Sequence, residues 1–272
     1  MRKSILILAL AFGTTFAFAQ DLTSKKGEQF LPKAKDWAIS IDGKPFLTLL
    51  SVGPNPTANF LTQDQTIAFK YFKDDQTAFR AKLRIGFSSL SEKALVPDAT
   101  STDPTKTVED KKTTSGMNIV LGGGIEKRKG STRLQGIYGA EALISMVSGS
   151  RTYDYGNALT KDNTSNAPQF GQSQGVTKET DGFKFGFGAR AFIGAEYFVL
   201  PKMSIGVEYG WGLMFSSQSN DKTETQYWGV PQGAAAGTAS SVQTQTTEKG
   251  GKSSFGLDTD LSNAAIFLTL HF

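Results

Sequence analysis

The stretch AFRAKLRIGF, residues 78–87, decides the fold class because apolar and charged residues alternate along it. Every odd-numbered position is apolar, whereas three even-numbered positions carry cations, namely Arg80, Lys82 and Arg84. A repeat of two residues is the period of a β-strand whose two faces meet different surroundings. The same alternation runs through GFKFGFGARAFIGAEYF at 182–198 and MSIGVEYGWGLMF at 203–215. The sequence therefore predicts an all-β protein.

Eight such runs lie between Trp37 and Phe272. They predict strands at about 37–50, 66–73, 77–90, 116–127, 133–147, 181–200, 202–216 and 254–272. Four connections are long and polar, at 51–65, 91–115, 148–180 and 217–253, and three are short, at 74–76, 128–132 and around Pro201. Long and short connections alternate, as do the external loops and periplasmic turns of outer-membrane barrels. We therefore predict an eight-stranded antiparallel transmembrane β-barrel at 37–272, with four long, mobile extracellular loops and three short periplasmic turns.

The N-terminus has the features of a secretory signal peptide. Arg2 and Lys3 precede an apolar run at 5–12, and Ala17-Phe18-Ala19 forms a cleavage site ahead of Gln20. We predict a signal peptide at 1–19, a short periplasmic segment at 20–36 and an outer-membrane location after cleavage near Ala19. Loss of Arg2 and Lys3 would lower the formal net charge from +4 to +2, a value that argues against nucleic acid as a partner.

The charged face of the strands is predicted to line the interior of the barrel. An Arg or Lys that faced lipid near the midplane of a bilayer would cost ~2–4 kcal/mol. An eight-stranded barrel has an interior just wide enough for side chains to fill. We therefore predict a narrow lumen closed by ion pairs, with Asp42 as a further anion. The predicted charge network, structural or pore-lining, comprises Lys70, Arg80, Lys82, Arg84, Glu126, Glu141, Lys184, Arg190, Glu196 and Glu208.

Several segments resemble the hairpins of small outer-membrane β-barrel proteins of Bacteroidota, which are Gram-negative. They are YFKDDQTAFRAKLRIGF at 71–87, GIEKR at 124–128 with RLQGIYGAEALI at 133–144, and GAEYFVLPKMSIGVEYGWGL at 194–213. The terminal strand alternates Ile266, Leu268, Leu270 and Phe272, which is similar to the signal that such barrels present to their insertion machinery. The resemblance implies outer-membrane lipid, lipopolysaccharide and, through Phe272, the insertion machinery as partners. It implies a fold and a location but no activity.

Catalytic and metal-binding patterns are sparse. With no cysteine, the chain lacks disulfides, thiolate metal sites and cysteine nucleophiles. The enzymes among small outer-membrane barrels depend on a histidine as general base, and the only histidine here, His271, is the penultimate residue with no serine or aspartate constellation identifiable beside it. Glu196 and Glu208, and likewise Glu126 and Glu141, are expected to face each other across tight hairpins. Such pairs occur as catalytic dyads in glycosidases, but with Arg and Lys in reach on neighbouring strands a salt-bridged plug is favoured. Asp258 and Asp260 lack the remaining ligands of a calcium loop. We predict no catalytic residue, metal or cofactor.

Three hypotheses for function follow. The first is a non-enzymatic integral outer-membrane barrel that acts through its surface loops, or as a structural protein with an unidentified membrane-protein partner. The second is a small porin-like channel for ions or small solutes, which needs a continuous water path past the charged residues. The third is a soluble secreted barrel that binds a small apolar ligand, which requires the two faces of the strands to be inverted.

Overall fold

The computed structural model describes residues 22–43, 66–259 and 265–272, so the predicted signal peptide lies outside the described residues. The described chain is built from antiparallel strands, which confirms the prediction of an all-β fold, and no helix in it is long and apolar enough to cross a membrane. The strands are β1 (Trp37–Asp42), β2 (Ile67–Asp74), β3 (Thr77–Pro97), β4 (Thr107–Lys129), β5 (Leu134–Asp154), β6 (Val176–Leu200), β7 (Met203–Gln218), β8 (Asp221–Gly229), β9 (Ser241–Lys249), β10 (Lys252–Thr259) and β11 (Ala265–His271).

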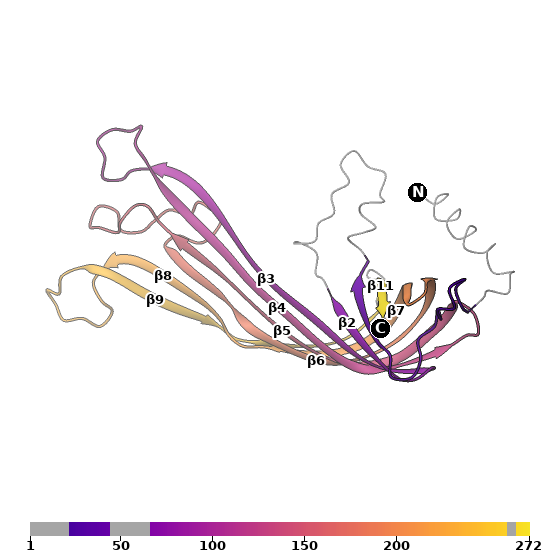
Figure 1. Cartoon of the computed structure of the whole chain (residues 1–272). Coiled ribbons are helices and arrows are strands. Elements are labelled where there is room, and N and C mark those ends of the chain that lie inside the picture. Colours follow the sequence, from indigo (N-terminus) through magenta and orange to yellow (C-terminus); the bar gives the residue numbers. More distant parts are fainter. Residues whose placement is uncertain (1–21, 44–65, 260–264) are drawn as a thin grey trace, which may run out of the picture.

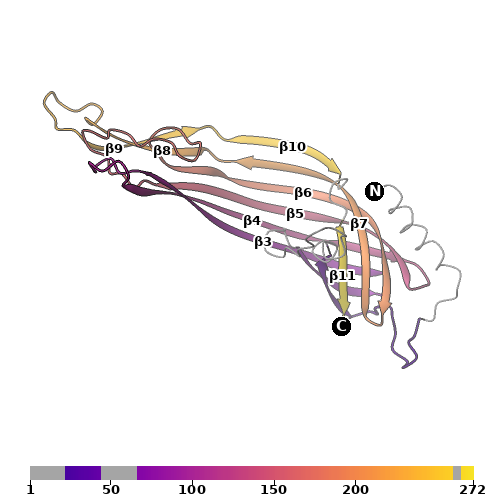
Figure 2. The same ribbon diagram turned by 90° about the horizontal axis from the view of Figure 1, so that it is seen from above.

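Eight of these strands close into a barrel-like ring. β1 to β7 pair in sequence order, and β11 pairs with both β7 and β1. The closing register places Leu268 opposite Ile205 on one side and Ile41 on the other. Figure 1 shows β2, β7 and β11 curling round at the same end of the molecule, and Figure 2 shows β7 and β11 side by side there. The three short turns, the start of β1 and the end of β11 all lie at this end, which we call the short-turn rim.

Four strands are much longer than predicted. β3 runs to Pro97, β4 begins at Thr107, and β6 begins at Val176, so large parts of the expected loops at 91–115 and 148–180 are strand. Serine and threonine are frequent in these added segments and lie in register, for example Ser91 opposite Thr113. The prediction of irregular loops was wrong here because hydrophobic periodicity ends where the apolar outer face ends, whereas strand pairing continues.

The long connection at 217–253 also differs from the prediction. It contains β8 and β9, which pair with each other over their full length, from Asp221 opposite Lys249 to Gly229 opposite Ser241. The threonines of TQTT at 244–247 suit a strand because their branched Cβ favours extended backbone. The predicted last strand at 254–272 is divided into β10 and β11, which pair with successive parts of β7, and residues between them lie outside the described residues.

Beyond the ring the sheet is open. β2 pairs with β3 only as far as Leu83, and on that side of β3 the described part of the chain supplies no further neighbour. β3, β4, β5 and β6 continue together with β8 and β9 as a long curved sheet, which we call the extension (Figure 1). At ~3.3 Å per residue, the 25 residues of β6 span about 80 Å. The molecule therefore combines a closed ring with the long open sheet of the extension.

The ring and its side chains follow the alternation seen in the sequence. On β3, Phe79 and Ile85 are 46% and 55% exposed on the outer face, whereas Arg80 between them is 7% exposed. On β2, Ala68, Lys70 and Phe72 are buried while Ile67 and Phe69 are exposed. The hydrophobic residues of the ring thus lie mainly outside, and the buried interior holds many of its charges.

The ring is expected to fold without the β8–β9 hairpin, because every strand of the ring has both its ring neighbours without it. Replacing residues 222–248 by a short Gly-Ser linker should leave a protease-resistant fragment that contains β3 to β7, identified by mass spectrometry. Deleting 265–272 is the control, since it removes β11 and should abolish the resistance. Loss of the fragment in the hairpin deletion would contradict the independence of the ring.

Candidate functional site: an ion-paired interior

The interior of the ring near the short-turn rim holds a first cluster of buried charges. Lys70 Nζ lies 3.0 Å from Glu126 Oε2 and 3.5 Å from Glu196 Oε2. Arg128 donates from Nε to Glu126 Oε1 at 3.1 Å, and from Nη2 to Glu196. These four side chains are at most 1% exposed. Two cations and two carboxylates thus neutralise each other where water is excluded.

A second cluster lies farther from the short-turn rim. Arg190 Nη1 is 2.9 Å from Glu141 and 2.6 Å from Glu208, and Lys82 Nζ is 2.7 Å from Glu141. Arg80 Nη1 is 2.8 Å from Glu208 Oε2 and 3.4 Å from Glu126 Oε2, so it joins the two clusters. The ion pairs therefore form one continuous network that crosses the interior from β2 and β3 to β7.

Glycines on the neighbouring strands make room for these long side chains. A Cβ at Gly124 would lie 2.6 Å from the Cβ of Glu141, and one at Gly210 would overlap the guanidinium of Arg190. Aromatic rings fill the remaining space. The guanidinium of Arg80 lies 4.1 Å from the ring centre of Phe192, and that of Arg128 lies 4.8 Å from that of Phe72. Such cation–π contacts complement the carboxylates as partners for the buried cations.

The structure brings together eight of the ten residues predicted for the network. They are Lys70, Arg80, Lys82, Glu126, Glu141, Arg190, Glu196 and Glu208. Lys184 is instead exposed at the start of the extension, and among the described residues it has no ion pair. Arg84 is half-buried farther along β3, outside the two clusters. Both departures occur where the ring opens into the extension and the interior is no longer enclosed.

Sequence reasoning missed several members of the interior, Arg128 and Phe192 among them. Arg128 was assigned to a turn, yet β4 continues through it to Lys129, and its even number places it on the same face as Glu126. Phe192 shares the inward face of β6 with Arg190 and Glu196, and its parity along the strand was the signal for this position.

The expected pairing of glutamates across hairpins is wrong. Glu196 is opposite Gly206, and Glu208 is opposite Gly194, so the two lie diagonally rather than face to face. Glu126 and Glu141 are displaced in the same way, opposite Gly139 and Gly124. The cations instead link Glu126 to Glu196, and Glu141 to Glu208, between different hairpins. This arrangement separates like charges within each hairpin.

A serine and a carboxylate do lie beside His271, which sequence reasoning did not find. His271 Nε2 is 3.3 Å from Ser204 Oγ and 3.4 Å from Glu196 Oε1, and Ser204 Oγ also contacts Glu196. In a Ser-His-acid triad the two ring nitrogens face different partners. Here both groups meet Nε2, Nδ1 has no hydrogen-bond partner among the described residues, and Ser204 is fully buried. The arrangement is therefore that of a packed polar cluster and lacks the geometry for nucleophilic attack.

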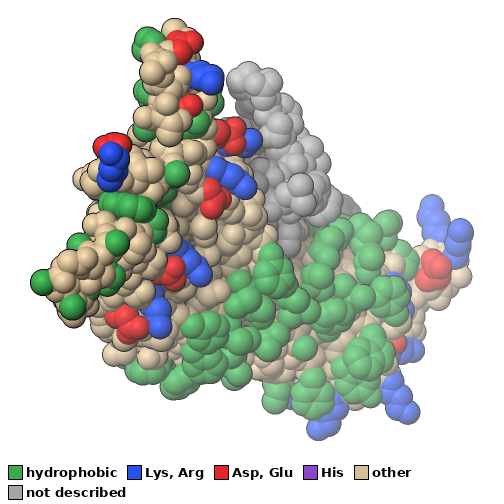
Figure 3. All heavy atoms as spheres, turned by 90° about the vertical axis from the view of Figure 1, so that its left-hand side faces the viewer, with side chains coloured by type: hydrophobic (Ala, Val, Ile, Leu, Met, Phe, Trp, Pro, Cys, Tyr) green, Lys and Arg blue, Asp and Glu red, His purple; other side chains and the backbone are tan. Residues whose placement is uncertain are grey.

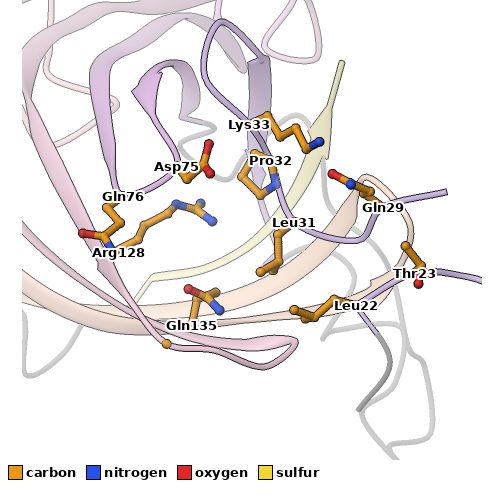
Figure 4. A pocket seen from close by; sticks show the side chains of 11 residues that line it. Leu22, Thr23, Gln29, Leu31, Pro32, Lys33, Asp75, Gln76, Arg128 and Gln135 are labelled. Carbon is orange, nitrogen blue, oxygen red and sulfur yellow. The ribbon is translucent and has the colours of Figure 1, made fainter.

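The segment that precedes β1 crosses the short-turn rim. Ala34 N donates to Asp75 Oδ1, Phe72 N donates to Asp36 O, and Arg133 stacks on the buried ring of Phe30 at 3.6 Å. Between this segment and the rim lies a pocket of 270 Å³ of mixed polar and apolar character, drawn in Figure 4 with Leu31, Arg128 and Gln135 on its wall. The segment thus covers the ion-paired interior from this side.

A second pocket of 460 Å³ lies on the extension between β5, β6 and β8. Tyr153 and Tyr155 line it, and both phenols are engaged, by Glu179 and by the backbone oxygen of Val176. Burial raises the pKa of Tyr153 to about 12, and the bond to Glu179 acts in the same direction. The Tyr153 phenol therefore remains a proton donor that links β5 to β6. The bond from Tyr155 to Val176 O fastens the connection at 155–175 to β6.

The outer face of the ring carries a broad apolar surface, which we call the apolar belt. Its exposed members include Ile39, Ile67, Phe69, Phe79, Ile85, Leu121, Ile125, Tyr138, Ile144, Phe187, Ile193, Ile205, Val207, Trp211, Leu213 and Leu270. Figure 3 shows hydrophobic side chains gathered over the ring, whereas the extension is largely uncharged polar surface with basic and acidic groups side by side. An exposed apolar surface of this extent is typical of a protein–protein or a membrane contact.

No group of three or more potential metal ligands occurs in the described part of the chain. Asp260, one of the two aspartates considered for calcium, lies outside the described residues. Comparison with protein-family models and with curated proteins found no match for this chain.

Removing the guanidinium of Arg128 should destabilise the ring, because Glu196 and Glu126 would then share only Lys70, Arg80 and His271 in a dry interior. We expect Arg128→Met to lower the free energy of unfolding by ~3–5 kcal/mol in a denaturant titration followed by tryptophan fluorescence. Lys161→Met, at an exposed position, is the matched control and should change it little. Equal effects of the two substitutions would show that water reaches the Arg128 site.

Proposed function

We propose that the protein is a non-enzymatic integral outer-membrane protein whose ring spans the bilayer and holds the extension outside the cell. The observation that carries this proposal is the pairing of an apolar outer face with an ion-paired interior in one closed ring of strands. A soluble barrel has the opposite polarity, with its apolar side chains inside. The hypothesis of a soluble secreted barrel that binds a small apolar ligand therefore loses support.

The dimensions of the apolar belt fit a bilayer. On β7 the outward apolar positions run from Ile205 to Phe215, which matches the ~9–11 residues that a tilted strand needs to cross the hydrocarbon core. Where the ring is closed, its backbone N–H and C=O groups are paired between strands, as a membrane span requires. The long strands beyond the belt are then exposed to water, in keeping with their serine and threonine content.

The ion-paired interior argues against a porin-like role. The network of Arg80, Glu126, Glu208 and their neighbours crosses the ring, and the segment at 22–36 covers its short-turn end. Moving these side chains aside for a solute would expose unpaired charges in a region of low dielectric. The role proposed here therefore resides in the extension, as a surface for partners in the surroundings or in the same membrane.

Tryptophan quenching tests the membrane placement. Trp211 lies in the middle of the apolar belt, whereas Trp228 lies on β8 in the extension. In vesicles with brominated acyl chains, a variant that keeps only Trp211 (Trp37→Phe and Trp228→Phe) should be strongly quenched. A variant that keeps only Trp228 (Trp37→Phe and Trp211→Phe) should not. Equal quenching of the two would refute the proposal.

Conductance tests the closed interior. Because the ion pairs fill the ring, the folded protein is expected to give no current steps above background in a planar bilayer. The positive control is a variant of this protein whose interior is opened by substitution. Arg190→Ala with Glu208→Ala removes the central ion pair of the second cluster. Steady steps from the wild-type protein would favour the porin-like alternative.

A further inference from the structure

The two margins of the apolar belt differ in charge. At the short-turn rim the outward face of β2 runs Ile67, Phe69, Tyr71 and then Lys73, and that of β4 runs Leu121, Gly123, Ile125 and then Lys127 and Lys129. Lys127 and Lys129 occupy the same face as the apolar residues of β4, at the next positions along the strand, and Lys73 lies at an irregularity of β2 between Phe72 and Asp74. The side chains of all three lysines are exposed. Basic side chains border the hydrophobic surface in Figure 3.

At the opposite margin, toward the extension, the belt is followed by uncharged residues. Beyond Phe87 the outward positions of β3 and its neighbours are Ser89, Ser115 and Ser150, which lie in register with one another. The next outward cations on β3 and β4 in the described chain are Lys93 and Lys111, about 20 Å beyond Phe87 at ~3.3 Å per residue. Lys93 is paired with Glu109 at 2.9 Å. On β2, β3 and β4, therefore, lysines without an ion pair in the described chain lie next to the apolar belt only at the short-turn rim.

The acidic groups at the short-turn rim are already engaged. Asp74 Oδ1 accepts a hydrogen bond from Gln76 N, Asp75 Oδ1 accepts one from Ala34 N, and Asp36 Oδ2 pairs with Lys202 Nζ at 2.5 Å. Burial acts to raise the pKa of Asp36, whereas hydrogen bonds and the charge of Lys202 lower it. The pKa of Asp36 lies below its ordinary value as a result, so the carboxylate keeps its negative charge at neutral pH.

In the part of the chain that the structure describes, the three lysines make no close ion pair, although the charge of Lys127 helps to lower the pKa of Asp74. Among the described residues none of Lys73, Lys127 and Lys129 has an ion pair, and Lys127 has one hydrogen bond, from Nζ to Thr77 Oγ1 at 2.8 Å. An ammonium group has three donors and a flexible stem that extends along apolar surface toward water. All three lysines therefore have N–H donors available to an external acceptor.

We propose that Lys73, Lys127 and Lys129 bind the phosphate groups of anionic phospholipids in the leaflet at the short-turn rim. This inference rests on the proposed membrane placement and adds a lipid class to it. The phosphate of a phospholipid lies directly at the end of the acyl region, which is where lysines one position beyond the apolar belt place their charge. Each lysine close to an anionic lipid surface contributes about fivefold to binding.

The test uses the full mature chain inserted in nanodiscs that contain equal amounts of phosphatidylcholine and phosphatidylglycerol. Native mass spectrometry measures the ratio of the two lipids that remain bound after the nanodisc is removed. We expect phosphatidylglycerol to be enriched on the wild-type protein. The variant Lys73→Gln/Lys127→Gln/Lys129→Gln should lower this enrichment at least fivefold, and replacement of the three lysines by arginine should retain it.

The matched control is Lys106→Gln/Lys161→Gln/Lys249→Gln, which removes three exposed lysines of the extension and should keep the enrichment. If the first triple variant does not insert, the three single variants replace it, and each should lower the ratio. No enrichment on the wild type, or an equal loss in the control, overturns the lipid assignment while leaving the membrane placement intact. Failure of the wild-type protein to insert overturns the membrane placement itself.

Discussion

The pairing of buried glutamates with buried cations is the interaction on which the rest of the structure depends. Glu126, Glu141, Glu196 and Glu208 have almost no contact with solvent, and an isolated carboxylate in such a place would cost several kcal/mol. Each meets at least two cations that come from other strands. The network therefore requires the correct register between strands distant in sequence, and a shift by one residue would turn the charges outward.

This arrangement reverses the usual division between core and surface. The apolar part of the interior is small. The described buried hydrophobic residues of the ring are Ala38, Ala68, Phe72, Ala78, Ile137, Phe192, Phe198 and Phe267. The strands of the ring are held by backbone pairing, by ion pairs inside and, in a bilayer, by lipid outside. With the interior filled, surfaces that a partner can reach lie on the extension and at the short-turn rim.

The sequence predicted the ring better than it predicted the network or the extension. A strict period of two along 78–87 and 203–215 was enough to assign strands and faces. The pairing of each glutamate with its cations depends on the register between strands. If β4 is taken to end at Lys127 instead of Lys129, Arg128 is assigned to the turn that follows and not to the interior. The extension was missed because its serines and threonines have no apolar period, and their strand structure comes from pairing across a hairpin.

The change from closed ring to open sheet divides the molecule mechanically. A ring has no free edge, so its cross-section cannot widen unless a complete ladder of hydrogen bonds breaks. The described sheet has free edges at β9, at β10 and along β3 beyond Leu83, and an open sheet changes its curvature through small adjustments of strand twist. The four strands β3 to β6 are thus part of a stiff ring along one half and of the flexible extension along the other. We expect a load applied at the tip of the β8–β9 hairpin to bend the extension and to leave the ion pairs inside the ring in place.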